Sequence, residues 1–275
     1  MKKFILTLLA LSMLCLTTTV SAKSIRIGTE GAYPPWNNLN SAGELEGAEI
    51  DFGNEACKRM GVDCEWVTQD WDGIIPALLN GKYDIIIAGM SITEERKEKV
   101  NFTNGYMNDG ARFAVMKGSG LENLDIMTKV NLNNAGGKEN AAIGQLNAAM
   151  KGKTVCVQSA TIHQNYIDTY MSGVAEMKLY AGVDETNQDL VNGRCDAILA
   201  DIASTMDYQA TDNGSNIVFT GPIFSGGVFG DGVGGAVRKE DTEILDMWNK
   251  VIAEMLADGS LGEITTVHFG RDMSM

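Results

Sequence analysis

Short apolar segments alternate with amphipathic ones along this chain, and this alternation limits the fold more than any other feature of the sequence. In the first part of the chain the expected strands are SIRIGTE (24–30), CEWVTQ (64–69) and DIIIAGM (84–90), and the expected helices cover 51–60, 71–79 and a segment from Thr93. Strands that alternate with helices in this way form a mostly parallel sheet covered by helices. The sequence therefore predicts an α/β fold.

The same alternation starts again after an irregular stretch that follows Phe102. Here the expected strands are KTVCVQ (153–158) and CDAILAD (195–201), and the expected helices are 161–171 and one that ends over 188–192. We therefore expect a second α/β unit. Between the two units, residues 118–150 are polar and rich in Asn and Gly, which indicates a surface excursion rather than a third domain.

The first 22 residues have the pattern of a secretory signal peptide. Lys2 and Lys3 precede an apolar run over 4–16, and small residues follow up to Ala22, where we expect cleavage. The apolar run is shorter than the roughly 20 residues that a membrane-spanning helix needs. A lipid anchor on Cys15 is a weaker alternative, because the bulky Leu14 stands where lipid attachment requires a small residue.

The charge of the mature chain limits its partners. Without the two signal-peptide lysines, 20 basic residues remain against 36 acidic ones, a net charge of −16. Such a chain repels nucleic acid and anionic lipid, so a nucleic-acid partner is not expected.

Four cysteines remain after cleavage, an even number in a chain bound for an oxidising compartment. Cys57 lies in the last turn of an expected helix and Cys64 opens the next strand, so we expect a disulfide between them. Cys156 and Cys195 each lie in an expected strand, and a second disulfide or two buried thiols are both open. A metal site is not expected, since the two histidines, His163 and His268, form no ligand pattern with the cysteines.

Two strand-to-helix turns have the character of an anion site. The first, IAGMSITEER (87–96), combines Ser91 with Arg96, and Thr93 can cap the helix; the second opens a helix at Thr161. Free N–H groups at a helix start and an arginine fork both suit a carboxylate. The alternative for Arg96 is a surface position paired with a neighbouring glutamate.

Acidic and aromatic residues lie at other turns of the expected sheets. Asp201 closes a strand and could accept an ammonium group, although capping the following helix is a role that it could also have. Glu30, Tyr33, Glu49 and Trp71 together would suit a cationic side chain, through charge and cation–π contact. Core packing for the aromatics and a solvated face for the glutamates are the alternatives.

These motifs resemble a known family. IRIGTEGAYPPW (25–36), DWDGIIPALLNGKYDIIIAGMSITEERKEKVNFT (70–103) and GRCDAILAD (193–201) are similar to segments of the periplasmic solute-binding proteins of polar amino-acid ABC importers. The similarity is greatest to the lysine/arginine/ornithine binders and to the octopine and nopaline binders. It implies a two-lobe, type II periplasmic-binding-protein fold with the ligand cleft between the lobes.

The resemblance also implies lobe boundaries and a place of action. Lobe 1 would comprise 23–107 and 228–275, lobe 2 would comprise 108–227 with 118–150 as an insertion, and the chain would cross near Met107 and Gly227. The protein would act in the periplasm as a monomer, deliver a small-molecule ligand to an inner-membrane ABC permease, and need no cofactor.

The resemblance assigns a role to each site residue. Arg96, Ser91 and the backbone at Thr161 and Ile162 would bind the α-carboxylate of the ligand. Asp201 and Gly89 would bind the α-ammonium. Around the side chain of the ligand, Tyr33 and Trp71 would stack and Glu30 and Glu49 would face its cationic end. The remaining residues of these turns that the resemblance places at the ligand are Ala88, Met90 and His163.

Ligand identity is divided between two classes. Ala88 and Gly89 replace serines of the lysine/arginine/ornithine binders, and with His163 and the insertion they resemble the opine binders. Asp201 instead suits a free α-ammonium. We therefore expect a binder of a basic amino acid, arginine first, or of an arginine-derived opine, with no catalytic step. The alternative is a periplasmic dehydratase of the same fold (cyclohexadienyl dehydratase-like), in which Glu30, Glu49 or His163 would act as general acid or base.

Overall fold

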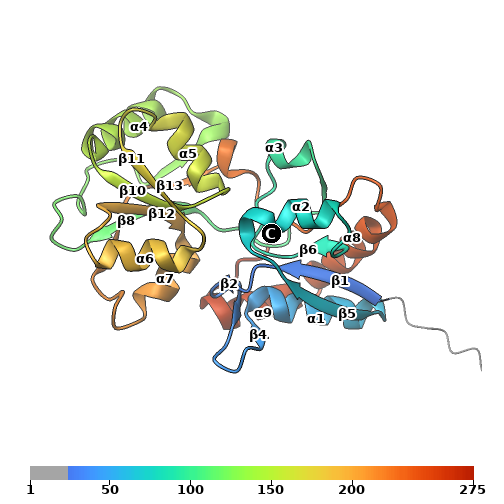
Figure 1. Ribbon diagram of the computed structural model, residues 1–275. Coiled ribbons are helices and arrows are strands. Elements are labelled where there is room, and N and C mark those ends of the chain that lie inside the picture. Colours follow the sequence, from blue (N-terminus) through green and yellow to red (C-terminus); the bar gives the residue numbers. More distant parts are fainter. Residues whose placement is uncertain (1–23) are drawn as a thin grey trace, which may run out of the picture.

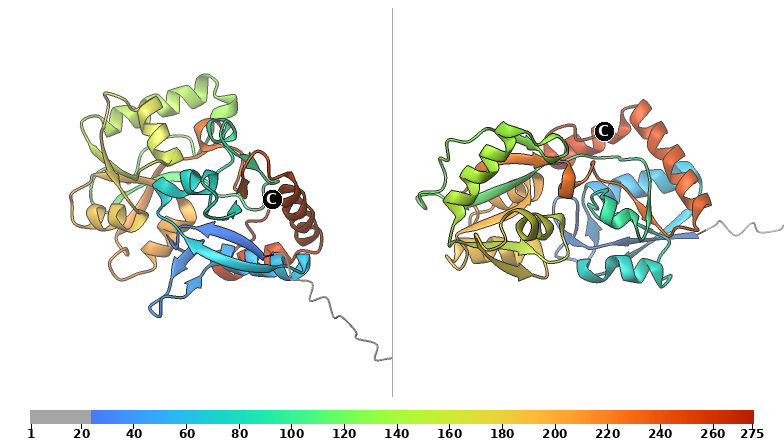
Figure 2. Two further views of the ribbon diagram at one scale, coloured as in Figure 1. Left: turned by 45° about the vertical axis from the view of Figure 1, so that its right-hand side comes forward. Right: turned by 90° about the horizontal axis from the view of Figure 1, so that it is seen from above.

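The computed structural model describes residues 24–275, so the expected signal peptide lies outside the described residues. The chain forms two α/β lobes that lie side by side, each built around its own sheet (Figure 1). Both views of Figure 2 show the same separation, with the segments of the middle of the chain in one lobe and both ends of the described chain in the other. The predicted α/β class and two-lobe architecture are confirmed.

The first lobe contains a five-stranded sheet that combines parallel and antiparallel strand pairs. In spatial order its strands are β5 (Asp63–Thr68), β1 (Ser24–Thr29), β6 (Ile85–Ile86), β14 (Ala236–Val237) and β7 (Asn101–Phe102). Strand β1 pairs in parallel with β5 and β6, whereas β14, which arrives from the far end of the chain, is antiparallel to β6 and β7. A small antiparallel sheet follows β1 and consists of β2 (Ala32–Tyr33), β3 (Asn37–Leu39) and β4 (Leu45–Glu46).

Helices cover both faces of this sheet, as its strand pattern requires. The elements are α1 (Ala48–Met60), η1 (Trp71–Gly73), α2 (Ile74–Leu79), α3 (Glu94–Lys97), α8 (Thr242–Ala257) and α9 (Ser260–Phe269). Ile85 and Ile87 pack in one hydrophobic cluster with α1, α8 and α9, and Ile86 packs in another with α2. Successive side chains of a strand point to opposite faces of the sheet, so three consecutive buried isoleucines indicate that both faces are covered.

The second lobe repeats this plan around a six-stranded sheet. Its strands in spatial order are β11 (Glu176–Tyr180), β10 (Thr154–Gln158), β12 (Ala197–Asp201), β8 (Ala111–Met116), β13 (Ile217–Ser225) and β9 (Lys129–Asn131). Its helices are η2 (Leu132–Asn134), α4 (Gly137–Met150), α5 (Ile162–Tyr170), α6 (Val183–Val191), α7 (Ile202–Gln209) and η3 (Gly227–Phe229). Strand β10 is parallel to β11 and β12, so the carboxyl ends of β10 and β12 point the same way.

Residues 118–150 are not the surface excursion that their composition indicates. Strand β9 pairs with β13 at the edge of the second sheet, and α4 buries Ile143, Leu146 and Met150 in the core of that lobe. The apolar positions of α4 are separated by Gly, Asn and Gln, so composition alone conceals its buried face. The segment therefore completes the second lobe.

The chain crosses between the lobes twice. It leaves the first sheet after β7 and enters the second at β8, and it returns between β13 and β14. Met107, on the first crossing, forms antiparallel bridges with Val233 on the second crossing and with Ser274 near the C-terminus. The crossings and the end of the chain therefore lie together.

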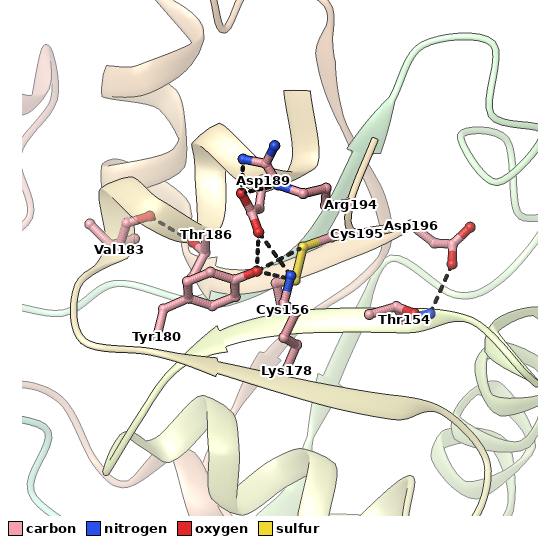
Figure 3. The surroundings of a disulfide bond; sticks show 10 residues. All are labelled: Thr154, Cys156, Lys178, Tyr180, Val183, Thr186, Asp189, Arg194, Cys195 and Asp196. Carbon is pink, nitrogen blue, oxygen red and sulfur yellow. Dashed lines mark hydrogen bonds and ion pairs between the residues drawn. A yellow bond between two sulfur atoms is a disulfide. The ribbon is translucent and has the colours of Figure 1, made fainter. Parts of the chain in front are cut away.

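Both pairs of cysteines form disulfides. Cys57 and Cys64 join the end of α1 to β5, which confirms the predicted bond. The sequence left it open whether Cys156 and Cys195 form a bond. In the structure they do, and the bond joins β10 to the segment just before β12 (Figure 3). Over this second bond lies Tyr180, whose hydroxyl is 3.6 Å from Cys156 Sγ and donates to Asp189.

Among residues 24–275 there is no helix with both the length and the apolar character needed to cross a bilayer.

Candidate ligand-binding site

A cavity lies between the lobes, at the carboxyl ends of the parallel strands of both sheets, and side chains that bond across it leave only about 20 Å³ that a water-sized group can occupy. The residues that line it are Glu30, Tyr33, Trp71, Ala88, Gly89, Ser91, Arg96, Gln158, Thr161, Ile162, His163 and Asp201. The fold thus brings together all the predicted ligand-binding residues except Glu49 and Met90, and it adds Gln158.

Arg96 reaches the cavity from the short helix α3. The hydroxyl of Thr93 caps this helix and accepts a bond from the Arg96 amide at 3.2 Å. The guanidinium donates to the Ser91 carbonyl at 3.0 Å and lies 5.2 Å from the ring centre of Trp71. Burial lowers the pKa of Arg96 to about 10, and the charges of Glu95 and Asp201 oppose this drop. A buried cation with this little compensation favours an anionic ligand group.

The neighbouring glutamates are engaged elsewhere. Glu94 pairs with Lys97 at 2.8 Å, and Glu95 accepts from Asn165 of the other lobe at 2.8 Å. The alternative in which Arg96 is a surface residue paired with one of them is therefore not what the structure contains.

The start of α5 faces Arg96 from the second lobe. Thr161 caps the helix by accepting from the Gln164 amide at 3.3 Å, and its own hydroxyl donates to the Gln158 carbonyl at 2.7 Å. Ala160, just before the cap, has a φ of 56°, which is unusual for a residue other than glycine. Its carbonyl accepts from Trp71 Nε1 at 3.1 Å, so this strained turn is tied to the first lobe.

Asp201 projects into the cavity from the end of β12. Tyr33 donates its hydroxyl to Asp201 Oδ2 at 2.6 Å, across the two lobes, and His163 Nε2 lies 3.3 Å from Asp201 Oδ1. Burial and the charge of Asp201 raise the pKa of Tyr33 well above its usual value, which keeps Tyr33 a hydrogen-bond donor. The carboxylate is thus held in the cavity by groups that an ammonium could join or replace.

Glu30 lies at the acidic end of the cavity and is paired with Gln158. Gln158 Nε2 donates to Glu30 Oε1 at 2.6 Å and to the Ala181 carbonyl at 3.0 Å. Burial raises the pKa of Glu30 to about 7; the bond from Gln158 opposes this rise, and neighbouring acidic charges add to it. Sequence reasoning missed Gln158, although its place as the last residue of a buried strand that ends at the cleft was a usable signal.

Glu49 does not line the cavity. It is fully buried behind Gly89 and accepts from Asn37 Nδ2 at 2.8 Å, from the Gly89 amide at 2.8 Å and from the Tyr106 hydroxyl at 2.6 Å. Burial raises its pKa, and these three donors oppose the rise. In this structure its carboxylate fixes the turn that carries Gly89 instead of facing the cavity.

Met90 lies on the far side of the same turn. Its side chain is fully buried and packs with Trp71 and Ile74 in the core of the first lobe. The chain turns at Gly89, which has a φ of 60°, so Ala88, Gly89 and Ser91 line the cavity whereas the Met90 side chain lies in the core.

Replacing Glu49 by Gln is expected to destabilise the protein by about 2 kcal/mol. The substitution exchanges one carboxylate oxygen for an NH2 group, so a buried donor that bonded to that oxygen loses its acceptor. Urea unfolding of both proteins measures the loss. Glu46→Gln is the matched control, since Glu46 is exposed and, within residues 24–275, accepts only from the half-buried Asn38. Equal small losses for the two variants would contradict a structural role for Glu49.

The chain is similar to known proteins over nearly its whole length. Residues 25–271 match the family of bacterial extracellular solute-binding proteins, family 3. An L-arginine-binding protein of Pseudomonas aeruginosa is 38% identical over 277 residues, covering 99% of this chain and 98% of that protein. The octopine-binding periplasmic protein of Rhizobium meliloti is 39% identical over 81% of this chain and 76% of its own length.

A solved structure has the same architecture. It is a periplasmic His/Glu/Gln/Arg/opine family-binding protein from Silicibacter pomeroyi in complex with lysine, with a TM-score of 0.73, 34% identity, and coverage of 91% of this chain and 99% of the other. With the family match over nearly the whole described chain, these likenesses show that this protein belongs to the bacterial extracellular solute-binding proteins, family 3.

Proposed function

We propose that this protein is the periplasmic substrate-binding component of an amino-acid ABC importer, and that it binds a basic amino acid, arginine first, or an arginine-derived opine. The observation that carries the proposal is the order of charges in one cavity. Arg96 and the start of α5 form a cationic end, Asp201 lies beside it, and Glu30 forms a second acidic position. This order matches a ligand with an α-carboxylate, an α-ammonium and a cationic side chain.

Each group has a role in this proposal. Arg96, Ser91 and the α5 N-terminus bind the α-carboxylate, and Asp201 with Gly89 binds the α-ammonium. Tyr33 and Trp71 flank the side chain of the ligand. The Glu30 carboxylate, held in place by the hydrogen bond from Gln158, pairs with the positive charge of that side chain. Glu49 no longer belongs to the ligand contacts and acts on Gly89 from behind.

Lobe closure accompanies binding in this proposal. Cavity residues of the two lobes are already joined by the Tyr33–Asp201, Trp71–Ala160 and Gln158–Glu30 bonds. A ligand that replaces such bonds would hold the lobes together in a shape that the permease recognises. Small-angle scattering should give a smaller radius of gyration for the ligand-saturated protein than for the ligand-free protein. Identical radii would contradict closure.

The direct test is calorimetric titration of unfolded and refolded, ligand-free mature protein. L-arginine, L-lysine, L-ornithine, octopine, nopaline and L-glutamate are the compounds to compare. Tight binding of arginine with weak opine binding is expected, because Asp201 suits an unsubstituted ammonium. Preference for an opine would assign the ligand to the second class of the proposal. Absence of binding to every cationic compound would contradict it.

The affinity for arginine is expected to fall by about 25-fold between pH 7.5 and pH 5.5, because Glu30, with a pKa of about 7 in the free protein, must lose its proton to face a cation. Affinity should rise with pH up to about 7 and then level off. Titration across this range, repeated with Glu30→Gln, measures the effect. The variant should bind more weakly at pH 7.5 and lose the pH dependence; an unchanged pH dependence would exclude Glu30 as its source.

A dehydratase is the second candidate function. It is favoured by the pKa of Glu30, which lies near neutral pH as a general acid or base requires. Incubation with prephenate or arogenate and detection of the aromatic product separates the two candidates. No turnover is expected, and turnover at an enzymatic rate would replace the binding proposal.

A further inference from the structure

Helix α7 begins without the side-chain cap that its sequence provides. Asp201 occupies the N-cap position, where an aspartate normally accepts a bond from the amide of the second or third helical residue. Its side chain makes no such bond. Both of its oxygens face the cavity instead, one 2.6 Å from the Tyr33 hydroxyl and the other 3.3 Å from His163 Nε2.

The missing cap comes from the first crossing segment. The amide of Ala203, the second residue of the helix, donates to Asp109 Oδ2 at 2.7 Å. The amide of Ile202 donates to the Gly110 carbonyl at 2.9 Å. Asp109, which lies 92 positions before Asp201 in the chain, therefore caps α7 in place of Asp201.

Asp109 is fixed from its other side as well. Its Oδ1 accepts from the Gly110 amide at 2.9 Å and from Arg271 Nη2 at 3.1 Å, and its side chain is only 3% exposed. Burial and the nearby charge of Asp201 raise the pKa of Asp109 to about 7. The hydrogen bonds from Ala203, Gly110 and Arg271 offset this repulsion and hold the two carboxylates near each other.

We propose that Asp109 is a positioning residue for ligand binding: it caps α7 in place of Asp201 and so leaves the Asp201 carboxylate to bind the α-ammonium of the ligand. Without Asp109 the Ala203 amide has no acceptor, and Asp201 stands at the N-cap position from which it can turn to supply one. This inference rests on the proposed function, because it takes Asp201 as the partner of the ammonium.

The test compares two ligands that differ only in the α-amino group, L-arginine and 5-guanidinopentanoate. Asp109→Ala is expected to weaken arginine binding by at least about tenfold and to change the affinity for 5-guanidinopentanoate by less than about threefold. In an Asp201→Ala background, Asp109→Ala should cause no further loss for arginine, because the two substitutions then act on the same interaction.

Three further variants separate capping from other roles of Asp109. Arg271→Met removes the ion pair but leaves the Ala203 bond, so arginine affinity should stay near that of the wild type. Asp109→Asn keeps an acceptor oxygen and should also stay near it. If the alanine variant does not fold, Asp109→Ser replaces it. The serine hydroxyl lies one bond short of the Asp109 oxygens and so does not reach the Ala203 amide, and this variant should show the same selective loss.

The proposal is overturned if Asp109→Ala, or the serine variant in its place, weakens both ligands equally or neither. It is also overturned if Arg271→Met gives the same selective loss, since the ion pair and not the cap would then be responsible. Wild-type protein that binds neither these two compounds nor an opine would contradict the proposed function and this inference with it. Wild-type binding of an opine alone, or wild-type binding of arginine with unaffected variants, would contradict this inference alone.

Discussion

Replacing Arg96 by Met is expected to weaken arginine binding by about 1000-fold, or about 4 kcal/mol, because it leaves the α-carboxylate of the ligand in a buried place without its charged partner. Methionine keeps the length and much of the apolar contact with Trp71. Burial lowers the pKa of Arg96, so the charged guanidinium is costly to bury in the free protein. Because methionine removes this cost, the free energy of unfolding of the variant should be at least that of the wild type.

Calorimetric titration gives the affinity, and thermal unfolding of the ligand-free proteins confirms that both are folded. Lys97→Met is the matched control on the same helix, because Lys97 is half-exposed and pairs only with Glu94 among the described residues. Its arginine affinity should stay within about twofold of the wild type. Retention of arginine affinity within tenfold by Arg96→Met would contradict the assignment of Arg96 to the α-carboxylate.

Removal of the second disulfide by Cys156→Ala with Cys195→Ala is expected to lower the free energy of unfolding by about 4 kcal/mol. The bond closes a loop with a sequence separation of 39, and loop length sets the entropy that a cross-link removes from the unfolded chain. Cys156 is also fully buried within β10, so its loss leaves space in the core of the second lobe.

The first disulfide supplies the control for this prediction. Its sequence separation is 7, so Cys57→Ala with Cys64→Ala should cost less, about 2.5 kcal/mol by the same chain-entropy relation. Urea unfolding of the wild type and the two double variants measures both losses. A loss for the second disulfide no larger than for the first would show that loop length does not govern its contribution.

Features that depend on neighbouring residues could be predicted from the sequence. The caps at Thr93 and Thr161 are set by residues within one helical turn, and the Cys57–Cys64 bond joins the end of a helix to the start of the next strand. The alternation of strands and helices likewise gave the α/β class, and its second occurrence gave the second lobe. In each case the interacting groups are so close along the chain that local geometry leaves few arrangements.

Where distant residues compete for a side chain, only the tertiary structure decided. Glu49 was expected at the ligand, but donors from Asn37, Gly89 and Tyr106 converge on it from three separate segments and turn it into the core. Asp201 was given two roles by its sequence position, and in the structure Asp109, from the crossing segment, takes the capping role.

The same reason explains Gln158 and the Cys156–Cys195 bond. Gln158 lines the cavity because Glu30, 128 positions away, accepts its hydrogen bond from the other lobe. Cys156 meets Cys195 because β10 and β12 pair side by side, which the sequence predicts only as two separate strands. The sequence by itself determined which residues could bind a ligand, cap a helix or form a disulfide. The packing of the two lobes decided which of these each residue does, because a buried polar group adopts the orientation in which its hydrogen bonds are satisfied.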